Sequence, residues 1–523
     1  MKSLDFYQKR ADDLIQQDAG RNRMLAAMEQ MWQAQWQLPE AVSGLGWIHK
    51  VVSTDPHDAL RAGVRVLSSA EPRIKVLPVG LGGLPETNLE QVEHALGWLF
   101  HQANRRRQAS VLRDIVLSAL LYDQVCTQVV YLPHQIKALQ AVGGGTASLR
   151  AARRAGDFVI LVRNPRHVHV RASDWTTEAV LFHQVVPAAD LVSFWGSQAD
   201  PIKEKLAADM QGELRYATVY DYTDLETRVI WCYLHPDANL LLPAAGLDGG
   251  TSPLEIIRRP HNLAFLPWVT RIGGTSLHRD PAHQQVPLLY SVYQSGQWDT
   301  QNILETLLTS EVIAYAAAPR LKVEGISDNV EVDYGEPRRM AFVPPGHKLE
   351  IIDAPAMDTS LAHIADRVSQ RIDKSTVPRI LQTGDFPAGT AYATLNLATQ
   401  SGLKSLAPYK ELAEQALAGI FQQIIDWIAL DGRPVLAYHQ NRGQVGQQII
   451  LDPAKLDPSR LFIEVALSAD VPADRAARIE AAATAVRELG YSRARALEFI
   501  GETDPALILA ERKREDTEEG EES

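Results

Sequence analysis

The sequence predicts an α+β fold built from long helices and antiparallel strand pairs, and three observations favour it. Apolar side chains recur at helical spacing over several long segments in both halves of the chain. The 523 residues are enough for about three to four folding units of typical size. In the first half, strand-like segments are predicted at residues 157–162 and 166–171, with a short turn between them, and at residues 216–222 and 227–234. Such strands pair in antiparallel fashion, which gives the α+β class.

Composition and charge exclude several classes of protein. With 46% hydrophobic and 22% charged residues, the chain has the make-up of a globular protein. The 52 Lys and Arg against 64 Asp and Glu give a net charge of -12. This balance argues against a basic face that grips nucleic acid, although nucleic acid could still slide past. No apolar run reaches the roughly 20 residues of a membrane span, and the charged N-terminal residues do not resemble a signal peptide, so we expect a cytoplasmic protein.

The two cysteines, Cys126 and Cys232, each lie in an apolar stretch. They are too few for a disulfide framework and lack the spacing of a zinc site, so we expect buried, reduced thiols. At the N-terminus, residues 4–36 have the spacing of two amphipathic helices with a break near Gly20. Further elements are predicted at residues 61–66 and 73–77, as strands, and at residues 88–122, as a long helix.

A histidine pair is the clearest candidate for chemistry. His167 and His169 alternate on the strand predicted over residues 166–171, so both side chains should project to one face, as in a metal-binding pair. One rival function is therefore a soluble metal-dependent phosphodiesterase or nuclease that uses His167, His169 and Asp174. Another is a helical adaptor or scaffold of non-viral origin.

Motifs typical of enzymes are missing. The sequence has no phosphate loop, GxSxG elbow, HExxH helix, paired cysteine ligands, kinase signature or EF-hand loop. This absence argues against an enzyme, and we expect no catalytic residues, no metal and no cofactor.

The second half of the chain alternates long helices with short segments bounded by Pro and Gly. Helices are predicted over residues 287–318, 358–377 and 391–430, with a small helical module over residues 472–514. Between them lie a β-like insert at residues 321–352 and a Gly-, Pro- and Thr-rich loop at residues 381–390. The acidic tail after residue 514 is too charged to pack and is predicted to be disordered.

Local stretches accompany this order of elements. They are Ser53–Asp58 ahead of a segment ending in Arg73–Pro78, the Asn164–Pro165 turn, Asn262–Trp268 before the first long helix of the second half, Ala318–Leu321 after it, and Ser492–Pro505. Together the order and the stretches cover about residues 55–505 and resemble the portal proteins of tailed bacteriophages, the ring-shaped DNA gates of the capsid vertex.

The resemblance implies a portal-like division of the chain into wing, helical stem, small clip and C-terminal helical crown. Its parts are the wing (1–285), stem helix 1 (286–320), the clip (321–357), stem helix 2 (358–378), the tunnel loop (379–390), the wing helix and strands (391–467), the crown (468–514) and the acidic tail (515–523).

The resemblance also implies a function and partners. The subunits would assemble as a homo-oligomeric ring, usually of twelve copies in the family, through which double-stranded DNA is packaged, retained and ejected. The implied partners are the terminase large subunit, a head-completion or tail adaptor, and the major capsid and scaffolding proteins, with no membrane involved. The protein would reside at the capsid vertex of the virion, and in the bacterial host cytoplasm before assembly.

Three groups of site residues follow from the resemblance. The tunnel loop would use Leu381, Thr383, Gly384, Asp385, Pro387, Gly389 and Thr390. Candidate basic residues of the channel or clip are Lys322, Arg338, Arg339, Lys348, Arg367, Arg371 and Lys374. The stem interface would use the apolar stripe Leu361, Ile364, Val368 and Ile372, which a helix projecting alone would leave exposed to water.

The predicted channel region is acidic overall. Between Val286 and Ala391, nine Lys and Arg minus fourteen Asp and Glu give a net charge of -5. A wall of this charge repels phosphate on average, which favours sliding of DNA over tight binding. Alternatively, Asp366, Arg367, Arg371, Asp373 and Lys374 pair along and between neighbouring helices.

Overall fold

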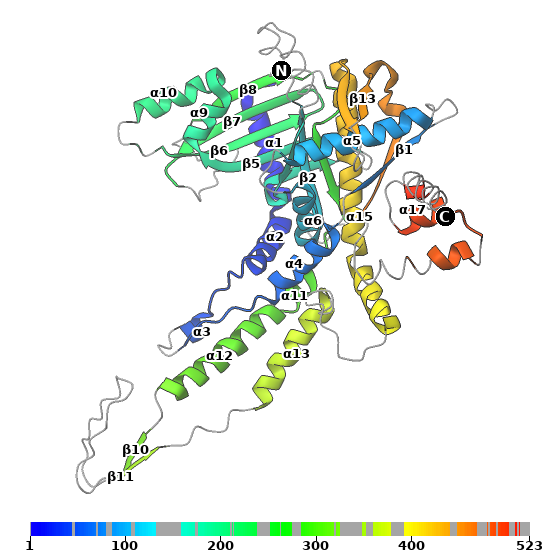
Figure 1. The fold of residues 1–523 in the computed structure, drawn as a ribbon. Helices are drawn as coiled ribbons and strands as arrows, with labels where there is room; N and C mark the ends of the chain where they lie inside the picture. The colour runs from blue at the N-terminus through cyan, green and yellow to red at the C-terminus, as the bar shows by residue number, and fades with distance from the viewer. Residues whose placement is uncertain are drawn as a thin grey trace.

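The computed structural model describes residues 2–43, 48–69, 72–79, 86–105, 110–131, 158–172, 176–209, 212, 214–237, 252–261, 263–274, 284–317, 321–324, 348–351, 359–377, 392–439, 447–467, 479, 482–487, 490–500, 508–509 and 512. Figure 1 shows a body of sheets and helices from which a pair of helices projects, with a small hairpin beyond their far ends. The predicted mixture of helices and antiparallel strands is confirmed, since every strand pair in these ranges is antiparallel.

Two helices begin the chain, and they break at Asp18, near Gly20 as predicted. They are α1 (Leu4–Gln17) and α2 (Ala19–Trp32). Helix α1 buries Tyr7, Ala11 and Leu14 against the aromatic side chains of the larger sheet. Helix α2 instead packs into the main core, so the corner at Asp18 lies between two separate apolar clusters.

The strand predicted over residues 61–66 is wrong, because this segment is helical. Helix α4 spans Asp55–Leu67 and follows the short helix α3 (Glu40–Ser43). Pro56 stands in its first turn, where its fixed φ and missing N–H suit a helix start. Leu60, Val64 and Leu67 are buried at helical spacing, so packing decides for helix over the local alternation.

Two antiparallel sheets form the β part of the body. The larger has the order β4-β5-β6-β7-β8 and the smaller the order β3-β2-β9. The larger comprises β4 (Val168–Ala172), β5 (Thr177–Pro187), β6 (Tyr216–Asp224), β7 (Thr227–His235) and β8 (Leu254–Pro260). The smaller comprises β2 (Gln124–Tyr131), β3 (Phe158–Arg163) and β9 (Trp268–Ile272). Helices α9 (Ala188–Trp195) and α10 (Asp200–Ala208) share an apolar cluster with the larger sheet.

The strand, turn and strand predicted around Asn164 do not form a hairpin. Strand β3 belongs to the smaller sheet and β4 to the larger, so the turn passes the chain from one sheet to the other. The Asn164 side chain accepts a hydrogen bond from the Arg166 amide at 2.9 Å, which starts the 3-10 turn η1 (Pro165–His167).

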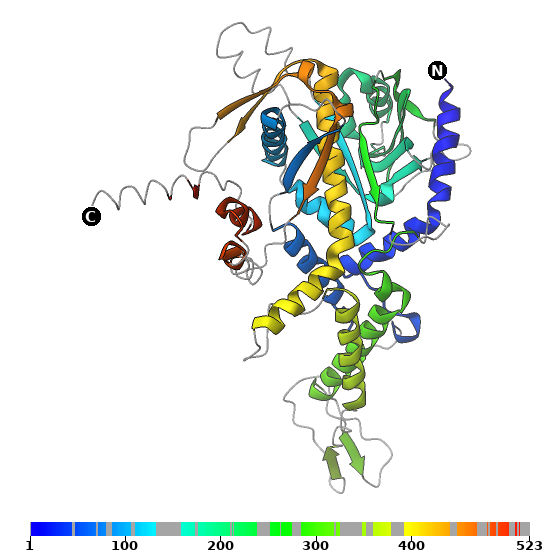
Figure 2. The ribbon, with the colours of Figure 1, turned by 90° about the vertical axis from the view of Figure 1, so that its right-hand side faces the viewer.

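The main core gathers around one long helix, as Figure 2 shows from the side. Helix α15 (Tyr392–Asp431) buries Leu417, Ile420 and Phe421 completely. It packs against α6 (Val111–Tyr122), β2 and β14. A Cβ on Gly419 would stand 2.7 Å from a methyl carbon of Val269 in β9, so only glycine permits this close helix–sheet approach.

The remaining elements complete the body. The helix predicted over residues 88–122 consists of α5 (Glu86–Arg105) and α6, two separate helices. Strand β1 (Arg73–Pro78) pairs with β14 (Leu461–Ala466), which is far away in the sequence. Strand β12 (Val435–His439) pairs with β13 (Gln447–Leu451), which follows it closely. Of the predicted crown, the structure describes α17 (Arg493–Ile500) and a few flanking residues. The acidic tail lies outside the described residues.

The projecting part begins with a correction. Instead of one helix over residues 287–318, the chain forms α11 (Tyr290–Gln294) and α12 (Gln297–Ala317). Gly296 between them has φ +62, a left-handed conformation that favours glycine and interrupts the helix. Helix α13 (Thr359–Ser375) packs against α12, and β10 (Leu321–Glu324) pairs with β11 (Lys348–Ile351) beyond their far ends (Figure 1).

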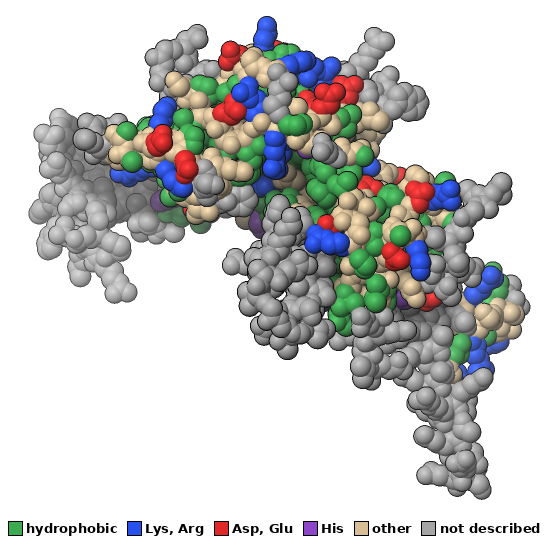
Figure 3. All heavy atoms as spheres, turned by 90° about the horizontal axis from the view of Figure 1, so that it is seen from above, with side chains coloured by type: hydrophobic (Ala, Val, Ile, Leu, Met, Phe, Trp, Pro, Cys, Tyr) green, Lys and Arg blue, Asp and Glu red, His purple; other side chains and the backbone are tan. Residues whose placement is uncertain are grey.

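Both cysteines are buried free thiols, as predicted, and burial raises the pKa of each to about 12. On the face seen in Figure 3, basic and acidic side chains are interspersed rather than gathered by sign. Among the described residues, no helix combines the length and the hydropathy needed to cross a bilayer.

Candidate functional site

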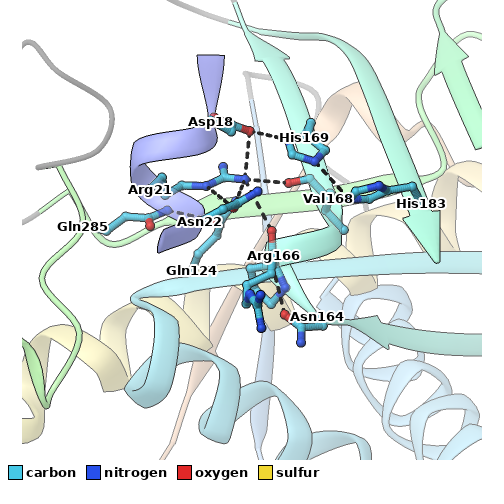
Figure 4. Close-up of polar contacts among 11 residues, drawn as sticks. Asp18, Arg21, Asn22, Gln124, Asn164, Arg166, Val168, His169, His183 and Gln285 are labelled. Atoms are coloured by element: carbon cyan, nitrogen blue, oxygen red, sulfur yellow. Dashed lines mark hydrogen bonds and ion pairs between the residues drawn. The ribbon is translucent and has the colours of Figure 1, made fainter. Parts of the chain in front are cut away.

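The predicted histidine pair is part of a buried cluster, but not in the predicted way. His169 lies on β4 with 0% of its surface exposed, whereas His167 lies in the turn η1 before that strand. The missed member is His183 on β5, two residues beyond Leu181, the cross-strand partner of His169. Its diagonal position brings the Nε2 atoms of His169 and His183 to 3.2 Å (Figure 4). Asp174 lies outside the described residues.

The corner between α1 and α2 supplies the charged partners of the cluster. Asp18 Oδ2 accepts a hydrogen bond from His169 Nδ1 at 2.7 Å and forms an ion pair with Arg21 Nη2 at 2.8 Å. Arg21 is itself buried and also donates to the carbonyl oxygens of Val168, at 3.1 Å, and Pro165, at 3.4 Å. The corner is thus bonded both to a side chain and to the backbone of the β4 segment.

Burial favours the neutral form of the three imidazoles. Burial is the largest cause that lowers the pKa of His167, His169 and His183, the last to about 3. His183 is further affected by its neighbours His169 and His167, which disfavour another positive charge. In the described part of the chain, no group of three or more His, Cys, Asp or Glu side chains could hold a metal ion.

A second cluster of polar side chains surrounds Glu29, near the C-terminal end of α2. Glu29 Oε1 accepts hydrogen bonds from Tyr122 Oη at 2.5 Å and from Asn164 Nδ2 at 2.6 Å. Its other oxygen pairs with Arg166 of η1. The Asp18–Arg21 pair and the Glu29–Arg166 pair therefore anchor α2 to the segment that passes between the sheets. Within each pair, the carboxylate and the guanidinium neutralise each other.

A strap along α12 was not predicted from the sequence. The extended segment His49–Ser53 runs antiparallel to the helix, and its alternate residues bond to helix side chains. The amides of His49, Val51 and Ser53 donate to Ser310 Oγ (2.7 Å), Thr306 Oγ1 (3.0 Å) and Asn302 Oδ1 (2.7 Å). Trp298 Nε1 donates to the Ser53 carbonyl at 3.2 Å.

The repeat length of the extended strap matches that of the helix, which explains the ladder of hydrogen bonds between them. Two residues of extended chain advance roughly 6.6 Å, and four residues of helix advance about 6 Å. A polar residue at every fourth helix position can therefore meet every second strap residue. This four-residue recurrence of Trp298, Asn302, Thr306 and Ser310 is the sequence signal that could have revealed the strap.

A polar bracket joins the base of the projecting pair to the body. Asp55 Oδ2, at the start of α4, accepts hydrogen bonds from Gln301 Nε2 of α12 at 2.7 Å and Ser369 Oγ of α13 at 3.0 Å. Gln301 Nε2 also donates to Glu305 at 2.9 Å. Burial first, and then the Asp55 charge, raise the pKa of the Glu305 carboxyl. One carboxylate thus fixes both projecting helices to α4.

The four predicted interface residues of α13 divide into two kinds. Val368 is 8% exposed and Ile372 is 0% exposed, and both belong to the main core of their own chain. This differs from the expectation that they need a neighbouring subunit to leave water, because α4 and α12 already pack against α13. Leu361 is half-buried, and Ile364 is 44% exposed.

The other predicted sites are described only in part. Arg367, Arg371 and Lys374 are exposed on α13. Lys322 and Lys348 stand in the β10–β11 pair, opposite Glu350 and Glu324 in the register. Arg338, Arg339 and the whole tunnel loop, Leu381 to Thr390, lie outside the described residues.

Comparisons with known proteins find a structural likeness but no match in sequence. No protein-family model matches the chain, and no curated protein sequence matches it. Among solved structures it is similar to a chain described as the neck of an empty GTA particle computed with C6 symmetry. The identity is 11% and the TM-score 0.43, over 88% of this chain and 94% of the other.

Proposed function

We propose that this protein is the portal subunit of a tailed bacteriophage, a non-enzymatic component that assembles into a ring at the capsid vertex. Double-stranded DNA would pass through the ring during packaging and ejection. The terminase large subunit would dock on it during packaging, and a head-completion or tail adaptor afterwards. The proposal combines the sequence resemblance with the arrangement of the described helices.

The projecting helix pair carries the proposal. Helices α12 and α13 extend away from the body and lead to the β10–β11 hairpin, in the positions that the resemblance gives to stem and clip (Figures 1 and 2). Val312 (48% exposed) and Ile313 of α12, together with Ile364 of α13, present apolar side chains to water on this narrow projection. A neighbouring copy packed against the pair would cover them.

The geometry of such a contact favours a ring. We propose a heterologous contact, in which the apolar side chains of one copy meet a different surface of the next. A head-to-tail contact of this kind repeats until it closes into a ring or continues as a filament. The strap and the bracket hold the pair at a fixed angle to the body, which favours closure.

The charges of α13 suit a wall past which DNA moves. Arg367, Arg371 and Lys374 recur at four- and three-residue spacing, so they lie along one side of the helix. Symmetry would multiply them into sparse basic rings within a region of net negative charge, giving weak, salt-sensitive contacts with phosphate. A weak contact lets the duplex slide.

The buried histidine cluster gives the hydrolase alternative no support. His169 and His183 are almost completely buried, and their facing nitrogens are used in contacts with each other and with Asp18. A phosphodiester substrate would have to displace the α1–α2 corner to reach them. We therefore propose a structural role for the cluster.

Mass photometry of the purified protein tests the proposed function. A ring of twelve copies of 57.8 kDa has a mass of about 694 kDa. We expect that species at low ionic strength, and class averages viewed down its axis should show a central channel. A protein that remains a monomer to tetramer at all concentrations, and that shows no ring with added DNA or scaffold, would contradict the proposal.

A further inference from the structure

The corner between α1 and α2 is held by a chain of hydrogen bonds from Asp18 through His169 to His183. Asp18, a carboxylate, can only accept, so His169 Nδ1 carries the hydrogen of their 2.7 Å bond. A neutral His169 then has a free electron pair on Nε2, and His183 Nε2–H donates to it across 3.2 Å. The His167 ring packs edge-on against His183, with 5.3 Å between ring centroids. A proton added to either imidazole would place a further positive charge in this buried cluster, beside that of Arg21.

The elements packed around the cluster bring carboxylates that are already paired. Asp18 is paired with Arg21, and Glu29 with Arg166. Asp18 at His169 and Glu29 at His167 still favour an imidazolium, but burial is the larger effect at both histidines and keeps the pKa of each lowered. The other titratable neighbours are uncharged, namely Cys126 of β2, whose pKa is raised, and Tyr220 of β6, whose ring lies 5.8 Å from that of His183. Arg21 and Arg166 lie close by and oppose further positive charge.

We propose that the Asp18–His169–His183 chain, with His167 beside it, is a proton-sensitive clasp that holds the α1–α2 corner on the larger sheet and opens in mild acid. The corner is suited to this because it lies between two apolar clusters rather than inside one. Opening it separates α1 and the start of α2 from β4 and β5 without breaking either sheet.

The direction of the effect follows from proton linkage. Burial lowers the pKa of each of the three histidines in the closed state, so the open state binds more protons below the ordinary value of 6.5. The clasp is therefore at full strength above about pH 6.5 and weakens as the pH falls below it. Between pH 7.5 and pH 5.5 the opening equilibrium rises about tenfold through His183, whose pKa in the closed state is about 3. His167 and His169 add to this rise in the same direction.

Hydrogen exchange of the full-length protein at pH 7.5 and 5.5 tests the clasp. After correction for the intrinsic exchange rate, peptides from residues 4–32 should lose about tenfold or more of their protection at pH 5.5. Peptides from α12, which contains no histidine, should change little. Equal protection of residues 4–32 at both pH values, or a uniform loss across the whole chain, would overturn the proposal.

A variant separates proton uptake from packing. In His183→Gln, the amide can still donate to His169 but cannot be protonated, so the pH response of residues 4–32 should fall by about tenfold. His363→Gln, at an exposed position of α13, is the matched control and should respond like the wild type. An unchanged response in His183→Gln refutes the clasp. If this variant does not fold, ring C2–H exchange in the wild type decides, because a buried His183 that titrates near pH 6.5 is incompatible with it.

Discussion

Replacing Thr306 by Val removes one complete contact of the strap while keeping the shape of the side chain. Thr306 Oγ1 accepts from the Val51 amide at 3.0 Å and donates to the Val51 carbonyl at 3.1 Å. Leaving two partly buried backbone groups without partners costs about 1 kcal/mol each, at the lower end of the usual range, or about 2 kcal/mol together. Both residues are β-branched, so the helix propensity barely changes. We therefore expect the strap to open about 30-fold more often.

Amide hydrogen exchange at residues 48–53 measures this opening directly. Exchange there should accelerate about 30-fold in Thr306→Val, while α12 itself keeps its protection. Thr309→Val is the matched control, because Thr309 is half-buried on the same helix and its hydroxyl makes no hydrogen bond within the described residues. If both variants exchange at the wild-type rate in the strap, the hydrogen-bonded ladder does not hold the segment, and the reasoning from matched periods fails.

Three further outcomes are expected. Ile364→Asp should leave a folded protomer that no longer forms rings in sedimentation. Val368→Asp places a charge in the core, so it should lower the free energy of unfolding by several kcal/mol and reduce the amount of folded protein. Equal behaviour of the two variants would contradict the division of the α13 stripe into an exposed and a buried part. Gly273→Ala should destabilise by about 1–3 kcal/mol in thermal unfolding, because the new Cβ would stand 1.9 Å from Asp123 Oδ1, and an unchanged melting temperature would refute that close approach. Deleting Thr383–Pro387 should preserve the ring but impair DNA retention in filled heads; full infectivity would contradict the tunnel-loop assignment.

Local sequence was a sufficient guide where one pattern acts alone. The helical stripes of α1, α2, α13 and α15 depend on a periodicity that survives in any packing, and each helix lies close to its predicted range. The antiparallel strands β6 and β7 were equally predictable, because β-branched and aromatic residues flank a short turn. The buried cysteines followed from their apolar surroundings.

Prediction failed where two local signals competed. Residues 61–66 alternate like a strand, but Asp55 and Pro56 ahead of them are helix-start residues, and the buried stripe through Leu60 and Val64 decided for the helix. Around Asn164, the predicted order of strand, turn and strand is confirmed, but the sequence did not indicate which sheet each strand joins. The structure uses the same turn to cross between sheets, a choice that depends on which neighbours each strand finds.

The sequence by itself determined the class of this protein, namely long helices with antiparallel sheets, a net negative charge and two long helices around a short insert in the second half. Only the tertiary structure decided which distant side chains meet: His183 with His169, Asp18 with His169, and the strap with α12. The physical reason is that periodicity is written in neighbouring residues. A buried polar contact such as these instead joins residues 14 or even 255 positions apart and becomes stable only when both partners leave water together.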